Sequence, residues 1–211
     1  MSPLQRLRPS ATRVPLGVKI PFALFVVVWF PIYWAKNGPA NFLWGSDLAL
    51  ILTAIALWTE CRLLASMTAV GVLVAEFAWN GDFLGRILFG IDAVPGPGTA
   101  YMWDAAKPIW LRGLSLFHVA LPVVTIWLVH RLGYDRRALA FETALAWVVL
   151  PLSWWIGGPE KNINWTYGFG HEPQGWLPDP LYLGFVMVLF PLAVFLPTHL
   201  LLGRLFPDPG R

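Results

Sequence analysis

The chain has 211 residues, of which 57% are hydrophobic and 13% are charged, and its mean hydropathy is +0.59. Soluble domains carry about 25% charged residues, so this composition excludes an ordinary soluble domain and predicts an integral membrane protein. The formal net charge of +3 is small, and the topology described below accounts for it without a nucleic-acid partner.

Six apolar stretches follow one another along the chain, each close to the roughly 20 residues that a helix needs to cross the hydrocarbon core. Membrane-spanning segments are expected near residues 18–35, 42–59, 63–79, 114–131, 138–156 and 181–202. Only the residues ECR separate the second from the third, which predicts a tight turn. Because no alternating barrel pattern is present, the sequence predicts an all-α membrane protein, a single bundle of six transmembrane helices.

Basic residues are distributed unevenly between the two sets of connecting segments. With a cytoplasmic N-terminus, the inner segments hold Arg6, Arg8, Arg13, Lys19, Arg62, Arg131, Arg136, Arg137, Arg204 and Arg211. The outer segments hold only Lys36, Arg86, Lys107, Arg112 and Lys161. The positive-inside rule therefore predicts a multi-pass protein of the cell membrane with both termini cytoplasmic, and an even number of spans agrees with this.

Two outer loops are long enough to carry function. The first covers about residues 80–113, and the second reads GGPEKNINWTYGFGHEPQGWLPDP. The second loop is either an aromatic belt with a capping loop or a lid over an outward-facing site. If it is a lid, the expected substrate-binding residues are Ser46, from the start of the second span, and the loop residues Asn162, Asn164, Trp165, Tyr167 and His171.

Three ionisable residues lie just inside the outer ends of expected spans. Asp47 lies in the second span, Glu76 in the third, and His118 early in the fourth, within the apolar run LSLFHVALPVV. Charged side chains at this depth are costly unless they meet one another, water or a ligand. We therefore expect Asp47, Glu76 and His118 to converge on one polar cluster in the outer leaflet, bordered by Ser46 and Asp82.

Each of these three residues also has a structural interpretation. A lone His118 can be a core histidine bonded to a backbone carbonyl, and Glu76 can extend to water at the interface. Asp47, in the sequence GSD, suits the N-terminus of the second helix, where an acid also interacts favourably with the helix dipole.

Acidic residues on the inner side are interpreted as structural. Glu142 is expected to form an interfacial ion pair with Arg136 or Arg137, and Glu60 is expected to pair with Arg62.

The expected outer cluster has the composition of an acid–base pair. A carboxylate beside a histidine fixes the imidazole tautomer and stabilises its cation, so we expect His118 to act as a general base oriented by Asp47 or Glu76. No G-x-S-x-G motif marks a nucleophile. The nucleophile stays open between water and the hydroxyls of Ser46, Ser115 and Thr166.

The histidines give little support to a metal or haem. The outer cluster together with His171 offers four side chains of metal-ligating types, but no H-x-x-x-H or H-E-x-x-H spacing is present. His130 and His199 lie at similar depth near the inner side, whereas His118 and His130 point about 120° apart on an ideal helix. We therefore expect neither metal nor other cofactor.

The second half of the chain carries a family resemblance in three segments: LFHVALPVV, NINWTYGFG and PQGWLPDPLYLGFVMVLFPLAVFLP. Their order resembles the YwaF-type integral membrane proteins, distant relatives of the androgen-induced-gene lipid hydrolases and their acyltransferase cousins. Those proteins have a Leu-Pro-Leu-x-Leu-Cys type stretch in an early span, whereas this chain reads SDLALILTAIAL. No nucleophile therefore carries over, and only His118 does, by position. The resemblance implies lipid-directed acyl chemistry.

These observations lead to one hypothesis and two alternatives. The leading hypothesis is an outward-facing polar pocket that binds or processes a lipid or other amphipathic small molecule, with acyl-ester hydrolysis or transfer as the reaction. One alternative is a proton-coupled transporter with Glu76 and Glu142 as a relay, which requires a continuous polar path. The other is a non-catalytic structural subunit whose thirteen tryptophans contact lipids and membrane protein partners.

Overall fold

The computed structural model describes residues 14–91, 98–169 and 172–206, and within these ranges every regular element is a helix. The α-helices are α1 (Leu16–Asn37), α2 (Gly45–Thr59), α3 (Arg62–Phe89), α4 (Ile109–Leu114), α5 (Phe117–Leu132), α6 (Ala138–Lys161), α7 (Asp179–Leu189) and α8 (Leu196–Leu205). Short 3-10 helices lie at η2 (Pro39–Leu43), η3 (Ala100–Trp103) and η4 (Ile163–Trp165). A π-helix, η5 (Phe190–Phe195), joins α7 to α8.

Five helical segments are long and apolar enough to cross a membrane: α1, α3, α4 with α5, α6, and α7 with α8. The sixth apolar helix, α2, has 15 residues, which at 1.5 Å per residue reach about 22 Å of a core about 30 Å thick. The fold is therefore that of an all-helical, multi-pass integral membrane protein. The predicted fold class is confirmed at this level, with α2 as the short member of the six expected spans.

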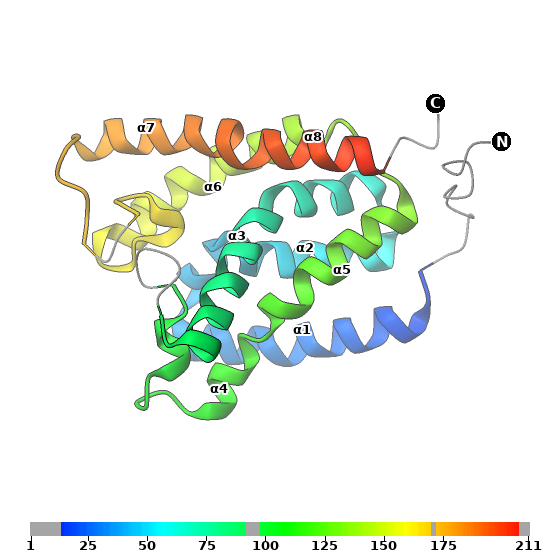
Figure 1. The fold of residues 1–211 in the computed structure, drawn as a ribbon, viewed down its shortest axis with the longest axis horizontal. Coiled ribbons are helices and arrows are strands. Elements are labelled where there is room, and N and C mark those ends of the chain that lie inside the picture. The colour runs from blue at the N-terminus through cyan, green and yellow to red at the C-terminus, as the bar shows by residue number, and fades with distance from the viewer. Residues whose placement is uncertain (1–13, 92–97, 170–171, 207–211) are drawn as a thin grey trace.

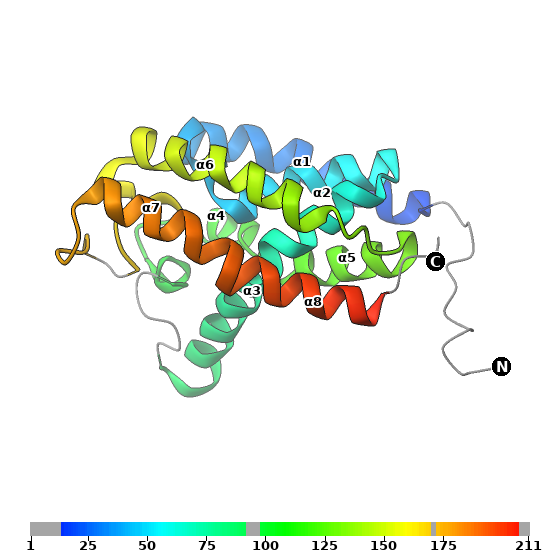
Figure 2. The ribbon, with the colours of Figure 1, turned by 90° about the horizontal axis from the view of Figure 1, so that it is seen from above.

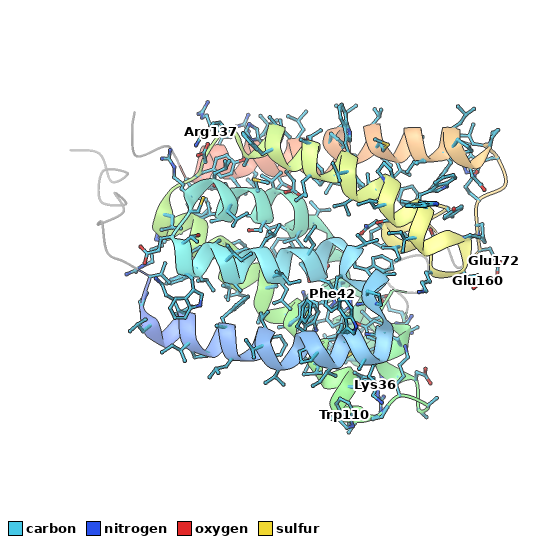
Figure 3. The ribbon with its side chains drawn as sticks, turned by 180° about the vertical axis from the view of Figure 1, so that it is seen from behind. Lys36, Phe42, Trp110, Arg137, Glu160 and Glu172 are labelled. Atoms are coloured by element: carbon cyan, nitrogen blue, oxygen red, sulfur yellow. The ribbon has the colours of Figure 1, made fainter. Side chains whose placement is uncertain are left out.

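The helices run alternately up and down, so α1 begins and α8 ends at the same end of the bundle (Figure 1). We call this the α8 end, and we call the opposite end, where α2, α5 and α7 begin, the His118 end. Figure 3 shows Arg137 at the α8 end, whereas Lys36, Glu160 and Glu172 lie at the His118 end. A first helix that begins and a last helix that ends on the same side fit an even number of passages. The side of the membrane that each end faces stays a prediction.

The central helix is α3, which packs against α5, α2 and α6. It continues to Phe89, ten residues beyond the expected end at residue 79, and its C-terminal half projects from the bundle in Figure 2. The expectation that residues 80–89 belong to a loop was wrong. Their Gly and Asn content is typical of a loop, yet the helix ends only at Gly90, whose φ of 65° lets its N–H bond back to Arg86.

Two ion pairs at the α8 end are ones that the sequence did not predict. Lys19 donates to Glu60 over 2.7 Å, and Arg137 binds Asp135 over 2.8 Å. The expected pair of Glu142 with a neighbouring arginine was wrong. Its Oε2 atom is buried and has no hydrogen-bond partner among the described residues, because α6 turns Glu142 toward α2 and α3 and away from the polar surface.

Candidate functional site

A cavity of about 360 Å³ opens within the His118 end, and we call it the polar cavity. Its walls come from α1, η2, α2, α3, α5 and the segment between α3 and α5, so residues far apart in the sequence meet there. The lining residues are Tyr33, Asn37, Asn41, Trp44, Ser46, Asp47, Ala75, Ala78, Trp79, Asp82, Gly98, Tyr101, Lys107, Leu111, Arg112, Ser115, His118 and Trp165. Four of the predicted site residues, Ser46, Asp47, His118 and Trp165, therefore share one cavity.

His118 forms a hydrogen-bonded pair with Glu76, one of the two carboxylates that the sequence predicts near it. The Nδ1 atom of His118 lies 2.9 Å from Oε2 of Glu76, which is fully buried. The imidazole stacks between two rings, with centroid distances of 4.1 Å to Phe117 and 4.6 Å to Trp79. If Nδ1 carries the proton and donates to Glu76, the lone pair of Nε2 is available to a molecule in the cavity.

Asn80 fixes the relative position of the two helices that carry this pair. Its Nδ2 group donates to the backbone oxygen of Glu76 over 2.8 Å and to that of His118 over 2.7 Å. One side chain of α3 thus binds both α3 and the first turn of α5. The other carboxylate atom of Glu76, Oε1, is buried without a hydrogen-bond partner among the described residues. The pair is consequently held in place by packing and by Asn80.

Asp47 lies in the first turn of α2 and is 4% exposed. Its carboxylate accepts a short hydrogen bond from the side chain of Asn41, and its side chain does not cap the helix. The partner of His118 is Glu76, and Asp47 lines the same cavity from another helix. The expected cluster thus consists of a bonded pair and one separate carboxylate.

The polar cavity also contains Tyr33, Trp79 and Tyr101, which sequence reasoning missed, beside Ser115, one of the candidate nucleophiles. The hydroxyls of Tyr33 and Ser115 are 2.8 Å apart, and the Trp79 indole donates to the Tyr101 hydroxyl over 3.3 Å. Burial raises the pKa of Tyr101, so its hydroxyl stays protonated. No local motif marks these residues. Their only signal is a polar group in or beside an apolar run, which does not say what it will face.

Two basic residues reach the cavity from the segment between α3 and α5. Arg112 donates from Nη1 to the backbone oxygen of Met102 over 2.7 Å, while its Nε is buried without a partner among the described residues. Lys107 lies 5.4 Å from the Tyr101 ring centroid. Both had been counted only as outer basic residues, because position in a loop does not reveal that the loop folds back over the bundle.

Asn164 attaches the second loop to α2 and α6. Its Oδ1 accepts from the Gly45 backbone N–H over 2.9 Å, and its Nδ2 donates to the Leu43 backbone oxygen over 2.7 Å and to the Ser153 hydroxyl over 2.9 Å. Its φ of 54° lies in the left-handed region, where asparagine is among the tolerated residues. Asn164 therefore holds the loop against the cavity wall.

The remaining loop residues divide between the cavity and the loop itself. Trp165 lines the polar cavity and packs edge-to-face on Trp44, with ring centroids 5.9 Å apart. Asn162 donates to the Gly168 backbone oxygen and accepts from the Tyr167 backbone N–H, and Tyr167 donates to a backbone oxygen of α6. Asn162 and Tyr167 thus fold the loop and do not line the cavity. His171 lies outside the described residues.

A second cavity, of about 230 Å³, lies between α2, α3, α6 and η5, and we call it the apolar cavity. Its walls are mainly aliphatic, formed by residues such as Leu52, Val72 and Leu145. It shares five lining residues with the polar cavity, so the two adjoin. The shared residues are Trp44, Ser46, Ala75, Ala78 and Trp165. Together the cavities offer a polar compartment beside an apolar one that extends along the bundle.

The buried carboxylate of Glu142 lines the apolar cavity, and Oε1 occupies space beside Gly71, where a Cβ atom would approach within 2.1 Å. Across the described ranges, no three His, Cys, Asp or Glu side chains gather in a way that could hold a metal ion.

Fold and cavities together define a multi-pass helical membrane protein with a histidine–carboxylate pair in a polar cavity. Comparison of the chain with family models, with curated proteins and with solved structures gives no match. The resemblance to the YwaF-type proteins stays a prediction.

Proposed function

We propose that this protein binds a lipid or another amphipathic small molecule, with its polar group in the polar cavity and its hydrocarbon chain in the apolar cavity. The observation that carries the proposal is the wall that the two cavities share beside a buried histidine–carboxylate pair. Small-molecule sites are concave, mainly apolar and supplied with a few convergent polar groups, and the two adjoining cavities fit this description.

The pair of His118 and Glu76 supports an enzymatic form of this function, acyl-ester hydrolysis or transfer. Nε2 of His118 would take the proton of a water molecule or of an alcohol as its oxygen attacks the ester carbonyl carbon. The bond from that carbon to the leaving oxygen then breaks, and the leaving alcohol receives the proton from His118. Glu76 would orient the ring and stabilise the imidazolium between the two transfers. Neither step requires a metal or another cofactor.

The apolar cavity favours this function over a proton relay. A relay from Glu76 to Glu142 needs polar groups or water between the two, whereas aliphatic side chains such as Leu48, Ala49 and Val72 line the space next to Glu142. A purely structural subunit explains neither the stacked His118 nor the buried Asp47. The outward orientation of the polar cavity and the cell membrane as its location remain part of the proposal.

The test measures binding and turnover separately, with protein purified in an uncharged maltoside detergent. Binding is measured by fluorescence anisotropy of a lipid with a labelled acyl chain, and turnover by release of fatty acid from unlabelled ester lipids. His118→Gln is expected to retain binding and to abolish release. His130→Gln, a matched change of an exposed histidine at the α8 end, is expected to alter neither.

Saturable binding without release, in the wild-type protein, would restrict the function to binding and refute the enzymatic form. Absence of saturable binding would refute the proposal as a whole.

A further inference from the structure

Asp47 is a buried carboxylate without a cation. Its hydrogen-bond donor is the neutral side chain of Asn41, and no ion pair with it occurs among the described residues. The other buried acids at the His118 end have basic partners: Glu76 binds His118, and Asp82 binds Arg86 over 3.3 Å. A buried charge in a membrane protein is costly unless it is paired, and it marks a ligand or ion position by default. Asp47 is thus the place in the polar cavity where a positive charge is missing.

Aromatic rings line the same cavity as this carboxylate. Tyr33, Trp44, Trp79, Tyr101 and Trp165 all line the polar cavity, and each comes from a different part of the chain. Rings of this kind attract a cation through the negative potential of their faces, and cages of several rings are the usual site for quaternary ammonium groups. A buried carboxylate among these rings is therefore suited to a large, weakly hydrated organic cation more than to a small metal ion.

The side of the cavity formed by the segment between α3 and α5 is instead suited to an anion. There Lys107 and Arg112 line the cavity, and Nε of Arg112 is buried without a partner among the described residues. An unpartnered guanidinium N–H is suited to an oxygen of phosphate or carboxylate, which it binds with a charge-assisted hydrogen bond. One cavity thus lacks a cation at Asp47 and an anion at Arg112.

We propose that the polar cavity recognises a zwitterionic headgroup of the phosphocholine type. The quaternary ammonium lies against Asp47 and the aromatic rings, and the phosphate lies toward Arg112 and Lys107. This inference rests on the proposed function, because the acyl chains of such a lipid would enter the adjoining apolar cavity. It goes further in naming the headgroup and the residue that selects it.

The experiment compares short-chain lipids that differ only in the headgroup, by isothermal titration of the full chain in maltoside detergent. Dihexanoyl phosphatidylcholine is expected to bind at least about tenfold more tightly than dihexanoyl phosphatidylglycerol, which has the phosphate but no cation. A third lipid, with 3,3-dimethylbutanol in place of choline, keeps the shape of the headgroup without its positive charge. It is expected to bind as weakly as the phosphatidylglycerol, and this comparison needs no protein variant.

Variants then assign the two charges. Asp47→Asn is expected to remove the preference for phosphatidylcholine and to leave phosphatidylglycerol binding unchanged. Asp179→Asn is the matched control, because Asp179 also lies in the first turn of a helix but is exposed and lines neither cavity. Lys107→Gln is expected to weaken the binding of both phosphatidylcholine and phosphatidylglycerol, since both carry phosphate. Lys161→Gln is expected to weaken the binding of neither.

Free phosphocholine separates a lipid from a soluble ligand as the source of this headgroup. Weak competition by phosphocholine means that the chains contribute and that the ligand is a lipid, whereas competition as strong as that of the lipid means a soluble ligand. Equal binding of all three lipids, unchanged in Asp47→Asn, would overturn the headgroup inference and leave the proposed function standing. If none of the three lipids binds, both the headgroup inference and the proposed function are overturned.

Discussion

Replacement of Asn164 by alanine tests whether the second loop is held to the cavity wall as described. The side chain makes three hydrogen bonds, to the Gly45 N–H, the Leu43 backbone oxygen and the Ser153 hydroxyl. Each such bond contributes about 1 kcal/mol net to stability. Alanine at a φ of 54° adds roughly 1 kcal/mol of backbone strain. Asn164→Ala should therefore lower the free energy of unfolding by about 4 kcal/mol.

The matched variant is Ser153→Ala, which removes only one of these bonds. It also removes the bond from the Ser153 hydroxyl to the Val149 backbone oxygen, but a bond of this kind within a helix adds little to stability, so the variant should cost about 1 kcal/mol. The assay is reversible unfolding in mixed micelles of maltoside and dodecyl sulfate, followed by circular dichroism. Ligand binding by Asn164→Ala, measured below its unfolding transition, is also expected to weaken because Trp165 loses its support. Equal stability losses of about 1 kcal/mol in both variants would refute the reasoning, since they would mean that the loop does not depend on Asn164.

Three further predictions concern other parts of the chain. Arg137, chiefly through its hydrogen bond, lowers the pKa of the Asp135 carboxyl, so the stabilisation is fully present above the ordinary value of about 3.8 and is lost as the pH falls through the lowered pKa. The unfolding free energy of wild type minus that of Asp135→Asn should accordingly be constant near neutral pH and shrink in acid, and a difference independent of pH would contradict this. Ala75→Phe, at the wall shared by the cavities, should weaken the binding of long-chain lipids more than that of short-chain lipids in the same titration, whereas the exposed Ala144→Phe should not. An equal loss of affinity for both chain lengths would mean that the acyl chain does not pass from the polar cavity into the apolar one. Gly90→Ala should cost about 1 kcal/mol in unfolding experiments because its φ is 65°, and an unchanged stability would show that the end of α3 does not depend on it.

The membrane-spanning helices were predictable because hydropathy is a local property of the chain. The expected ranges differ from the observed helices by a few residues at most ends, except at the C-terminal end of α3. There the residues NGDFLG have the composition of a loop, and tertiary contacts overrode it. Asn80 in particular donates to backbone atoms of two helices, a role that spacing alone does not show.

The sequence could predict only those residues of the candidate site whose burial in the membrane is costly. Ionisable residues in apolar runs are rare and expensive, which identified Asp47, Glu76 and His118. Which carboxylate would pair with His118 depended on helix rotation, and that information is not local. Tyr101 and Arg112 were missed for the same reason, since they reach the cavity only because their segment folds back over the bundle.

The most direct test of the account is to map where the acyl chain of a bound lipid lies. The probe is dihexadecanoyl phosphatidylcholine with a photoactivatable diazirine at the end of one chain, cross-linked to the protein in nanodiscs and located by mass spectrometry. The account predicts labels on residues that line the apolar cavity, such as Leu52 and Leu145, and their loss when short-chain lipid competes. Labels confined to exposed side chains of α1, such as Val27 and Val28, would mean that only surrounding bilayer lipid was captured. That result would contradict the central claim that the polar cavity and the adjoining apolar cavity together bind an amphipathic molecule.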